Sequence, residues 1–292
     1  MINYQALKSR HFPDIVQTYV ERDTMLYALG IGFGHDPMDE RQLQYVYEKN
    51  LRALPMMAAV LGYPGFWVKE PDTGIDWVRI LHGEQSIRIH KPLPVAGTVV
   101  GKLHIKSIVD KGKDRGALML QEREVFDQKT GELLATVDSL SFARGDGGFS
   151  EVAGNGPKGG DPAPPPPPPT PETEPEIVCD LPTLPQAALI YRLSGDYNPL
   201  HAEPAVATAA KFPRPILHGL ATYGVAGHAI LKTCCDYDAA RLKSLSVRFS
   251  APVFPGETIR TEIWRSANRV QYRARVLERD VVVLSHGVAE VV

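Results

Sequence analysis

The sequence has few of the features that mark several large classes of protein. It contains three cysteines in 292 residues, two of them adjacent at Cys234 and Cys235, which excludes a disulfide framework and favours a reducing compartment. The N-terminal segment lacks the apolar core of a signal peptide, and no run of about 18 apolar residues occurs. The C-terminal GVAEVV is not a peroxisomal Ser-Lys-Leu address. We therefore expect a cytoplasmic protein without a membrane segment.

A strong net charge is also missing. Lys and Arg number 32 and Asp and Glu number 34, which gives a formal charge of −2. Nucleic-acid binders rely on an excess of positive charge to attract phosphate, so we expect no nucleic-acid partner. An anionic ligand must instead be bound by a local group of basic residues.

What the chain does have is a clear division into two parts. Its 43% apolar content is enough for two globular cores. Residues 148–182 are rich in Gly and Pro, with six consecutive prolines at 164–169, a composition that favours extended polyproline II structure. We predict domains at 1–147 and 183–292 joined by this linker. The proline run is alternatively a ligand for a recognition domain.

The two parts share one layout, in which a helical tract precedes four strand-like runs. The helical tracts are 39–63 and 215–235, and the segments IRIHKPLPVAGTVVGKLHI and VRFSAPVFPGETIRTEIW recur in equivalent places. Antiparallel strands with short turns are expected in both. An apolar helix rich in small residues, such as 219–231, suits a position inside its own curved sheet. The sequence therefore predicts an α+β tandem hot-dog fold.

Three histidines in the second part invite a metal interpretation. His201, His218 and His228 are too far apart in sequence for a common ligand spacing, and no Cys or carboxylate stands at a metal-ligand interval from them. We therefore expect no metal site.

The segment SGDYNPLHAEP is the strongest candidate for chemistry. Gly195 and Pro199 interrupt regular helix around it, so Asp196 and His201 can converge from one irregular loop. A carboxylate and an imidazole that share a water can activate it and return its proton. The alternative is a purely structural turn, because Asp and Asn side chains bond nearby backbone groups.

Gly219 stands at the predicted start of the central helix of the second part. The first turn of a helix has unpaired N–H groups and a partial positive charge. A glycine there lets a thioester carbonyl approach, so that the N–H can stabilise an enolate oxygen. Its alternative role is to permit close packing.

The segment YRLSGDYNPLHAEPAVATAAKFPRPILHGLATYG resembles the signature of the hydratase 2, or MaoC-like, family of (R)-specific 2-enoyl-CoA hydratases. TYVERDTMLYALGIG, LHGEQSIRIHKPLP and VRFSAPVFPGETIRTEIW extend the resemblance to the two-hot-dog hydratase unit of peroxisomal multifunctional enzyme type 2. In that family the first half makes room for the acyl chain and the second half carries catalysis.

The resemblance implies a role for each candidate residue. Asp196 and His201 activate water, Asn198 helps to orient it, and Gly219 supplies an N–H to the thioester oxygen. The substrate-binding residues implied by the resemblance, from both halves, are His82, Gly83, Lys111, Tyr197, Pro199, Leu200 and Phe249. Among them Lys111 is expected near the CoA, and a point charge of this kind suits a phosphate.

The implied reaction is syn hydration of a trans-2-enoyl-CoA to a (3R)-3-hydroxyacyl-CoA, or its reverse. It needs no cofactor, since coenzyme A is part of the substrate, and the resemblance implies a homodimer. Two other classes stay open: a hot-dog thioesterase or non-catalytic acyl-CoA-binding protein, and an interaction protein recruited through the proline run. Thioesterases of this fold usually carry a carboxylate on the central helix, and 219–231 has none.

Overall fold

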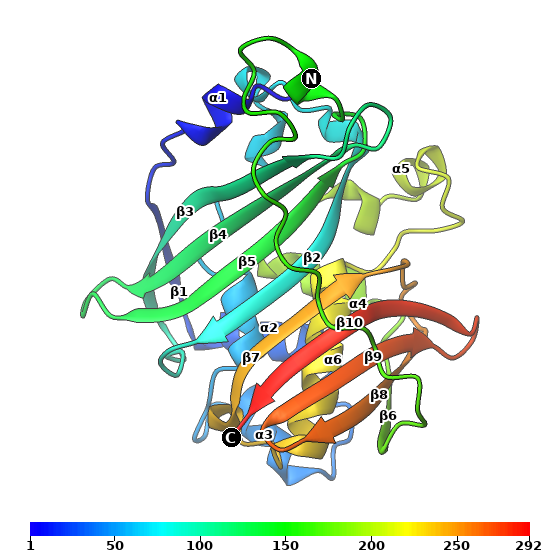
Figure 1. Cartoon of the computed structure of the whole chain (residues 1–292). Coiled ribbons are helices and arrows are strands. Elements are labelled where there is room, and N and C mark those ends of the chain that lie inside the picture. The colour runs from blue at the N-terminus through cyan, green and yellow to red at the C-terminus, as the bar shows by residue number, and fades with distance from the viewer.

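The computed structural model describes residues 1–292 and contains one ten-stranded antiparallel sheet (Figure 1). The strands, in their order across the sheet, are β1 Ile15–Tyr19, β3 Gly97–Asp110, β4 Ala117–Asp127, β5 Leu133–Ala143, β2 Ile80–Ile89, β7 Leu242–Phe249, β10 Val281–Val291, β9 Arg269–Val276, β8 Thr258–Ser266 and β6 Ile177–Pro182. The order 1-3-4-5-2 in one half repeats as 6-8-9-10-7 in the other. The repeat predicted from the sequence is therefore present in the topology, and the tandem hot-dog fold is confirmed.

The helices lie mainly on one side of this sheet. They are α1 Tyr4–Lys8, α2 Glu21–Gly30, α3 Glu40–Val46, α4 Ala187–Tyr191, α5 Pro204–Ala209 and α6 Gly219–Cys234, and the 3-10 helices are η1 Pro55–Ala59, η2 Trp67–Lys69, η3 Pro71–Thr73, η4 Trp77–Arg79, η5 Phe149–Glu151, η6 Arg192–Ser194, η7 Pro199–His201 and η8 Ala239–Arg241. None of them is both long and apolar enough to cross a bilayer.

The strands β2 and β7 join the two halves. They pair in antiparallel register from Glu84↔Arg248 to Arg88↔Ser244, and Arg248 Nε and Nη2 donate to Glu84 Oε1 at 2.9 and 2.6 Å. One core cluster of 47 buried residues includes side chains from both halves. Burial of apolar surface thus continues across the junction, and it holds the two halves as one body.

The two central helices differ, and this corrects the prediction of one helical tract over 39–63. In the second half α6 is continuous and contacts β6, β7, β8 and β10. In the first half the helix ends at Val46, Asn50 has a φ of 59°, and Pro55 begins η1. A proline cannot occupy a helix interior without loss of a backbone hydrogen bond. The short η1 therefore takes the place under β2 and β5 that α6 takes in the other half.

The proline-rich segment crosses the outer face of the sheet, on the side opposite α6 (Figure 1). Trp264 Nε1 donates to the carbonyls of Thr173 and Glu174 at 3.0 Å, and Gln271 Nε2 donates to that of Pro169 at 3.0 Å. The predicted linker ends in β6, which pairs with β8. The segment is therefore attached to the strands of the second half.

Candidate functional site

Asp196 lies in a four-residue loop between η6 and η7. Gly195, with a φ of 115°, ends η6 in the left-handed region, and Pro199 occupies the first position of η7. The backbone N–H of Asn198 donates to Asp196 Oδ1 at 3.2 Å, and that of Leu200 donates to Asn198 Oδ1 at 3.1 Å. The structural turn considered from the sequence is thus present, and Asp196 Oδ2 is left without a partner in the protein.

His201 ends η7 and is buried. Its Nδ1 lies 2.9 Å from the carbonyl oxygen of Ile216. That oxygen can only accept, so Nδ1 carries the proton and the neutral ring has its lone pair on Nε2. Burial lowers the pKa of His201 below its ordinary value of 6.5. The ring is therefore suited to accept a proton at Nε2 at neutral pH.

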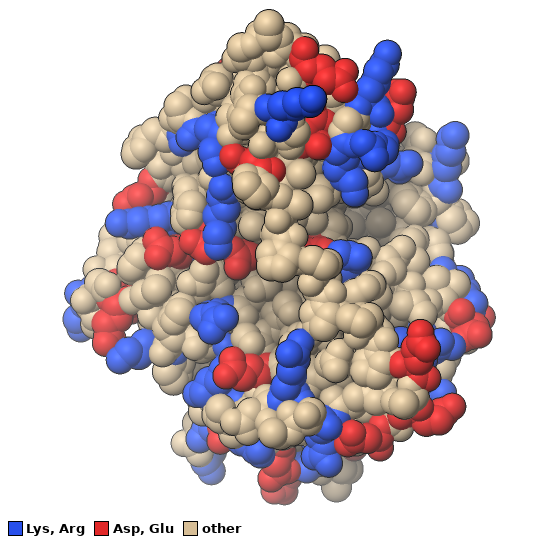
Figure 2. Space-filling view, viewed as in Figure 1, with Lys and Arg blue, Asp and Glu red and all other residues tan.

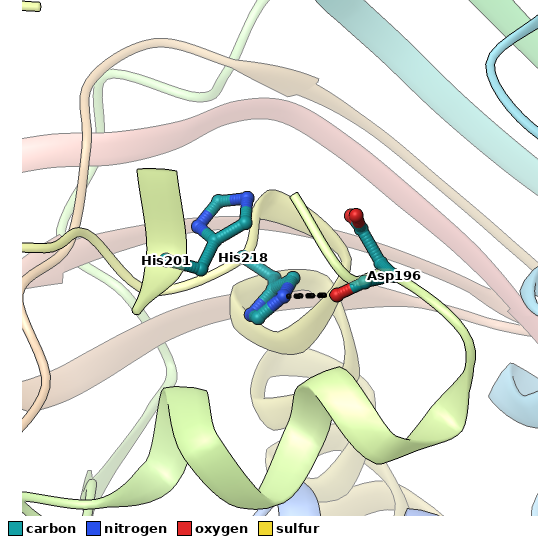
Figure 3. Close-up of side chains that lie close together, drawn as sticks. All are labelled: Asp196, His201 and His218. Carbon is teal, nitrogen blue, oxygen red and sulfur yellow. Dashed lines mark hydrogen bonds between the residues drawn. The ribbon is translucent and has the colours of Figure 1, made fainter. Parts of the chain in front are cut away.

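A third side chain, which the sequence did not single out for this site, completes the cluster. His218 stacks on His201, with ring centroids 3.7 Å apart and planes at 25°, and its Nε2 lies 3.1 Å from the carbonyl oxygen of Asp196 (Figure 3). In the sequence it was noted only as one of three histidines considered for a metal site, and it stands directly before Gly219. A nitrogen of each ring and a carboxylate oxygen of Asp196 all lie within 4.8 Å of one another.

This cluster corrects one step of the metal argument. The fold brings a carboxylate to two of the histidines, although no ligand spacing was visible in the sequence. His228 is not part of it, because that ring stacks on Phe33 with centroids 3.7 Å apart. The rings of His201 and His218 are nearly parallel, so their in-plane lone pairs run side by side and do not converge on one ion. The arrangement suits a shared water better than a metal.

Gly219 is the first residue of α6 and is exposed. The N–H groups of Ala221 and Thr222 both donate to the carbonyl of His218 at 3.1 Å, whereas the N–H of Gly219 has no acceptor in the protein. A Cβ on Gly219 would lie 3.3 Å from the ring of Phe249. The helix start therefore offers a free N–H with little room for a side chain.

The first half reaches the site through His82, on β2, which contacts Phe249 at the end of β7 in the second half. The ring of His82, on β2, lies 4.8 Å from that of Phe249. Gly83 lies at an irregularity in the pairing of β2 with β5, where a Cβ would approach the carbonyl of Leu140 to 3.2 Å. The structure thus brings His82, Gly83 and Phe249 together beside Gly219.

The remaining residues of the loop face outward. Tyr197 is 58% exposed and lies under the guanidinium of Arg192, 4.9 Å from the ring centroid. Asn198 and Pro199 are also exposed, and Leu200 is half-buried. The side-chain oxygen of Asn198 caps η7, so its first contribution is to hold the loop between Asp196 and His201.

Lys111 is not in contact with this cluster. It lies in the turn between β3 and β4, exposed and without an ion pair, and its N–H donates to the carbonyl of Gly116 at 3.1 Å. The register places this turn at the end of the sheet where β2 begins, since Ala143 pairs with both Ala117 and Ile80. Basic side chains gather at the upper right of Figure 2, next to a hollow in the surface. The exposed basic residues at this end of the sheet are Arg79, Lys111, Lys113, Arg115 and Arg144.

Fold and site together define a class of protein. It is a tandem hot-dog protein whose second unit holds an Asp/His pair beside a free helix N–H, and whose first unit lacks that motif. The MaoC like domain family matches residues 167–286, and the MFE-2 hydratase 2 N-terminal domain family matches residues 17–145.

Individual relatives agree. The protein named "Enoyl-CoA hydratase 2, peroxisomal" of Arabidopsis thaliana is 40% identical over 97% of this chain and 94% of its own length. The peroxisomal multifunctional enzyme type 2 of Mus musculus is 34% identical over 96% of this chain, which spans 37% of that enzyme. A MaoC-like dehydratase from Phytophthora capsici has a TM-score of 0.85 at 36% identity, covering 100% of this chain and 99% of its own. The chain belongs to the MaoC-like family of hydro-lyases, in its hydratase 2 branch.

Proposed function

We propose that the protein adds water reversibly across the double bond of a trans-2-enoyl-CoA to give the (3R)-3-hydroxyacyl-CoA. The observation that carries the proposal is the spacing of Asp196 and His201, within 4.8 Å, beside the free N–H of Gly219. Two atoms that each hydrogen bond one water at about 2.8 Å lie roughly 4.6 Å apart when the angle at the water is tetrahedral. A separation within 4.8 Å is compatible with one water bound between the two side chains.

In the proposed mechanism, this water attacks the β-carbon while one member of the pair removes its proton. His201 Nε2 is the natural acceptor, because Nδ1 already donates to Ile216. Charge develops on the thioester oxygen as the enolate forms, and the N–H of Gly219 stabilises it. The pair then delivers the proton taken from the water to the α-carbon on the same face, which returns both side chains to their starting states. All of these groups belong to the chain, so the mechanism needs no cofactor.

The acyl chain and the CoA are proposed to occupy different parts of the first half. The acyl chain extends towards η1, where the central helix is interrupted. The phosphates of CoA bind the basic end of the sheet that includes Lys111 and Arg115. His82 and Phe249 contact the thioester region between the two. Homodimer formation and a cytoplasmic location stay predictions.

A panel of trans-2-enoyl-CoAs of different chain lengths tests the function directly. Hydration is followed by the loss of absorbance of the conjugated thioester, and the configuration of the product is determined by chiral analysis. We expect turnover with at least one chain length and an R product. An S product, or hydrolysis of the thioester, contradicts the proposal. The thioesterase alternative is not favoured, because α6 carries no Asp or Glu.

The pH dependence of kcat/KM should reflect the neutral form of His201. Burial lowers the pKa of His201 below 6.5, so the ring stays neutral, and active as a base, to lower pH than a free histidine. We expect kcat/KM to be level near pH 7 and to fall on the acid side with an apparent pKa below about 6.5. Measurement of kcat/KM against pH in one buffer system checks this prediction. An acid limb with an apparent pKa above 7 contradicts it.

Exchange of the six prolines at 164–169 for six Gly and Ser residues separates the enzyme from the recruitment hypothesis. The segment crosses the face of the sheet away from α6, so kcat and KM should stay within about twofold of their original values. The unfolding free energy should fall by about 0.4–1 kcal/mol for each proline held without strain, because the unfolded chain becomes more flexible. Steady-state kinetics and thermal unfolding measure the two effects. Loss of turnover in the folded variant would mean that the prolines support the site.

A further inference from the structure

His218 is the one buried side chain of the cluster to which the proposed mechanism gives no task. It lies between the two segments that carry chemistry, since its Nε2 meets the carbonyl of Asp196 at 3.1 Å and its ring stacks on His201 at 3.7 Å. It also precedes α6, and its own carbonyl accepts from Ala221 and Thr222. A single residue thus contacts the loop of the carboxylate, the ring of the base and the start of the helix (Figure 3).

The hydrogen bonds of His218 define its charge state. The carbonyl of Asp196 can only accept, so Nε2 carries the proton. Nδ1 is buried and has no partner in the protein, so a second proton there would form a buried N–H without an acceptor. Burial, and then the neighbouring His201, lower the pKa of His218 to about 4. The ring is therefore neutral at physiological pH.

Other charged and titratable groups also face the stacked pair. They are Asp196 on the loop, Arg192 on η6 and Tyr191 on α4, whose ring centroid is 5.1 Å from that of His218. The negative charge of Asp196 favours protonated histidine, and the positive charge of Arg192 opposes it. Burial of the stacked rings away from water has a larger effect on the pKa of each histidine than either of these charges, and it lowers both pKa values.

We propose that His218 is a positioning residue of this site, whose N–H fixes the peptide of Asp196 and whose ring fixes the plane of the His201 imidazole. The proposal rests on the proposed function, because it assigns His218 a part in the same hydration. It gives the N–H and the ring separate tasks. The N–H sets where the carboxylate lies, and the ring excludes water from one face of the base.

Two substitutions separate these tasks. His218→Phe keeps a flat ring but has no N–H, whereas His218→Gln keeps an N–H donor but has no ring. In the Phe variant we expect kcat to fall roughly tenfold or more, the effect of one lost hydrogen bond at the part-buried carbonyl of Asp196, with little change in KM. In the Gln variant we expect a smaller loss of kcat and an acid limb of the pH profile shifted upward.

A measurement without substrate makes the inference independent of the reaction. The imidazole carbon resonances of His201 are followed by NMR through a pH titration in the original protein and in both variants. The pKa of His201 should rise towards about 6.5 in His218→Gln, where water reaches the ring, and stay lowered in His218→Phe. His218→Asn, with a shorter side chain, replaces the Gln variant if thermal unfolding shows that the latter does not fold.

Failure of the positioning role and failure of the proposed function give different results. If the pKa of His201 is the same in all folded variants, or if His218→Phe retains full kcat, the positioning role is wrong. If the original protein hydrates no enoyl-CoA, the proposed function is wrong, while the NMR titration still decides whether His218 controls the environment of His201.

Discussion

Asp196→Asn is expected to lower kcat for enoyl-CoA hydration by at least about a hundredfold, the range seen when general acid–base catalysis is lost. Asparagine has nearly the same shape, and its side-chain oxygen can still accept from the N–H of Asn198, as Oδ1 does at 3.2 Å. The turn should therefore persist. What is lost is the charge and the second oxygen, which has no other partner in the protein. KM should change little, and the loss of thioester absorbance measures both constants.

A matched control lies on the same segment. Glu203 is exposed and its side chain makes no hydrogen bond or ion pair, so Glu203→Gln removes one negative charge without touching the cluster. We expect it to keep the original kcat. If Asp196→Asn and Glu203→Gln behave alike, the carboxylate of Asp196 has no special role.

His201→Gln extends the same test to the other member of the pair. Groups that act on one water should not contribute independently, since either loss leaves the other without its task. We therefore expect the double variant, which combines Asp196→Asn with His201→Gln, to have about the same kcat as the slower of the two single variants. Losses that multiply would show that the two side chains act in separate steps.

The sequence predicted the parts of the fold that depend on local pattern. Among the eight long strands, β4 and β9 alternate regularly between buried positions and more exposed ones, and an alternation of this kind can be recognised in the sequence. The two edge strands, β1 and β6, were missed. Each is short, and β6 follows a proline-rich segment, so neither gives a distinct periodic signal.

In the candidate site, too, local sequence predicted some of the residues, whereas others depend on tertiary contacts. Asp196 and His201 are five residues apart on one loop, so Gly195 and Pro199 were enough to predict their convergence. His218 reaches them only because α6 starts beneath the loop, and the contact of His82 with Phe249 requires the pairing of β2 with β7. These are tertiary contacts between distant segments, for which local sequence has no signal.

The oxyanion role of Gly219 can be tested without breaking its helix. Proline is well tolerated at the first position of a helix, because the N–H that it lacks has no partner inside the helix. The preceding residue must be extended, and His218 already has a φ of −57° and a ψ of 137°. Gly219→Pro therefore removes the free N–H while the fold of α6 is retained. Its control is Gly219→Ala, which adds the same Cβ, 3.3 Å from the ring of Phe249, and keeps the N–H.

We expect Gly219→Pro to lower kcat by about a hundred- to a thousandfold, the effect of removing one donor to a developing oxyanion. Gly219→Ala should lose far less, because Phe249 is only half-buried and its ring can shift by a few tenths of an ångström. Circular dichroism and thermal unfolding verify that both variants keep their helix, and steady-state kinetics give kcat. The ratio of kcat in the two variants separates the effect of the lost N–H from the effect of crowding by the added Cβ.

If both variants are equally slow, space beside Phe249 limits the reaction and the N–H of Gly219 does not stabilise the enolate. If Gly219→Pro alone is slow, the start of α6 supplies the electrostatic half of the site, and Asp196 with His201 supplies the proton-transfer half.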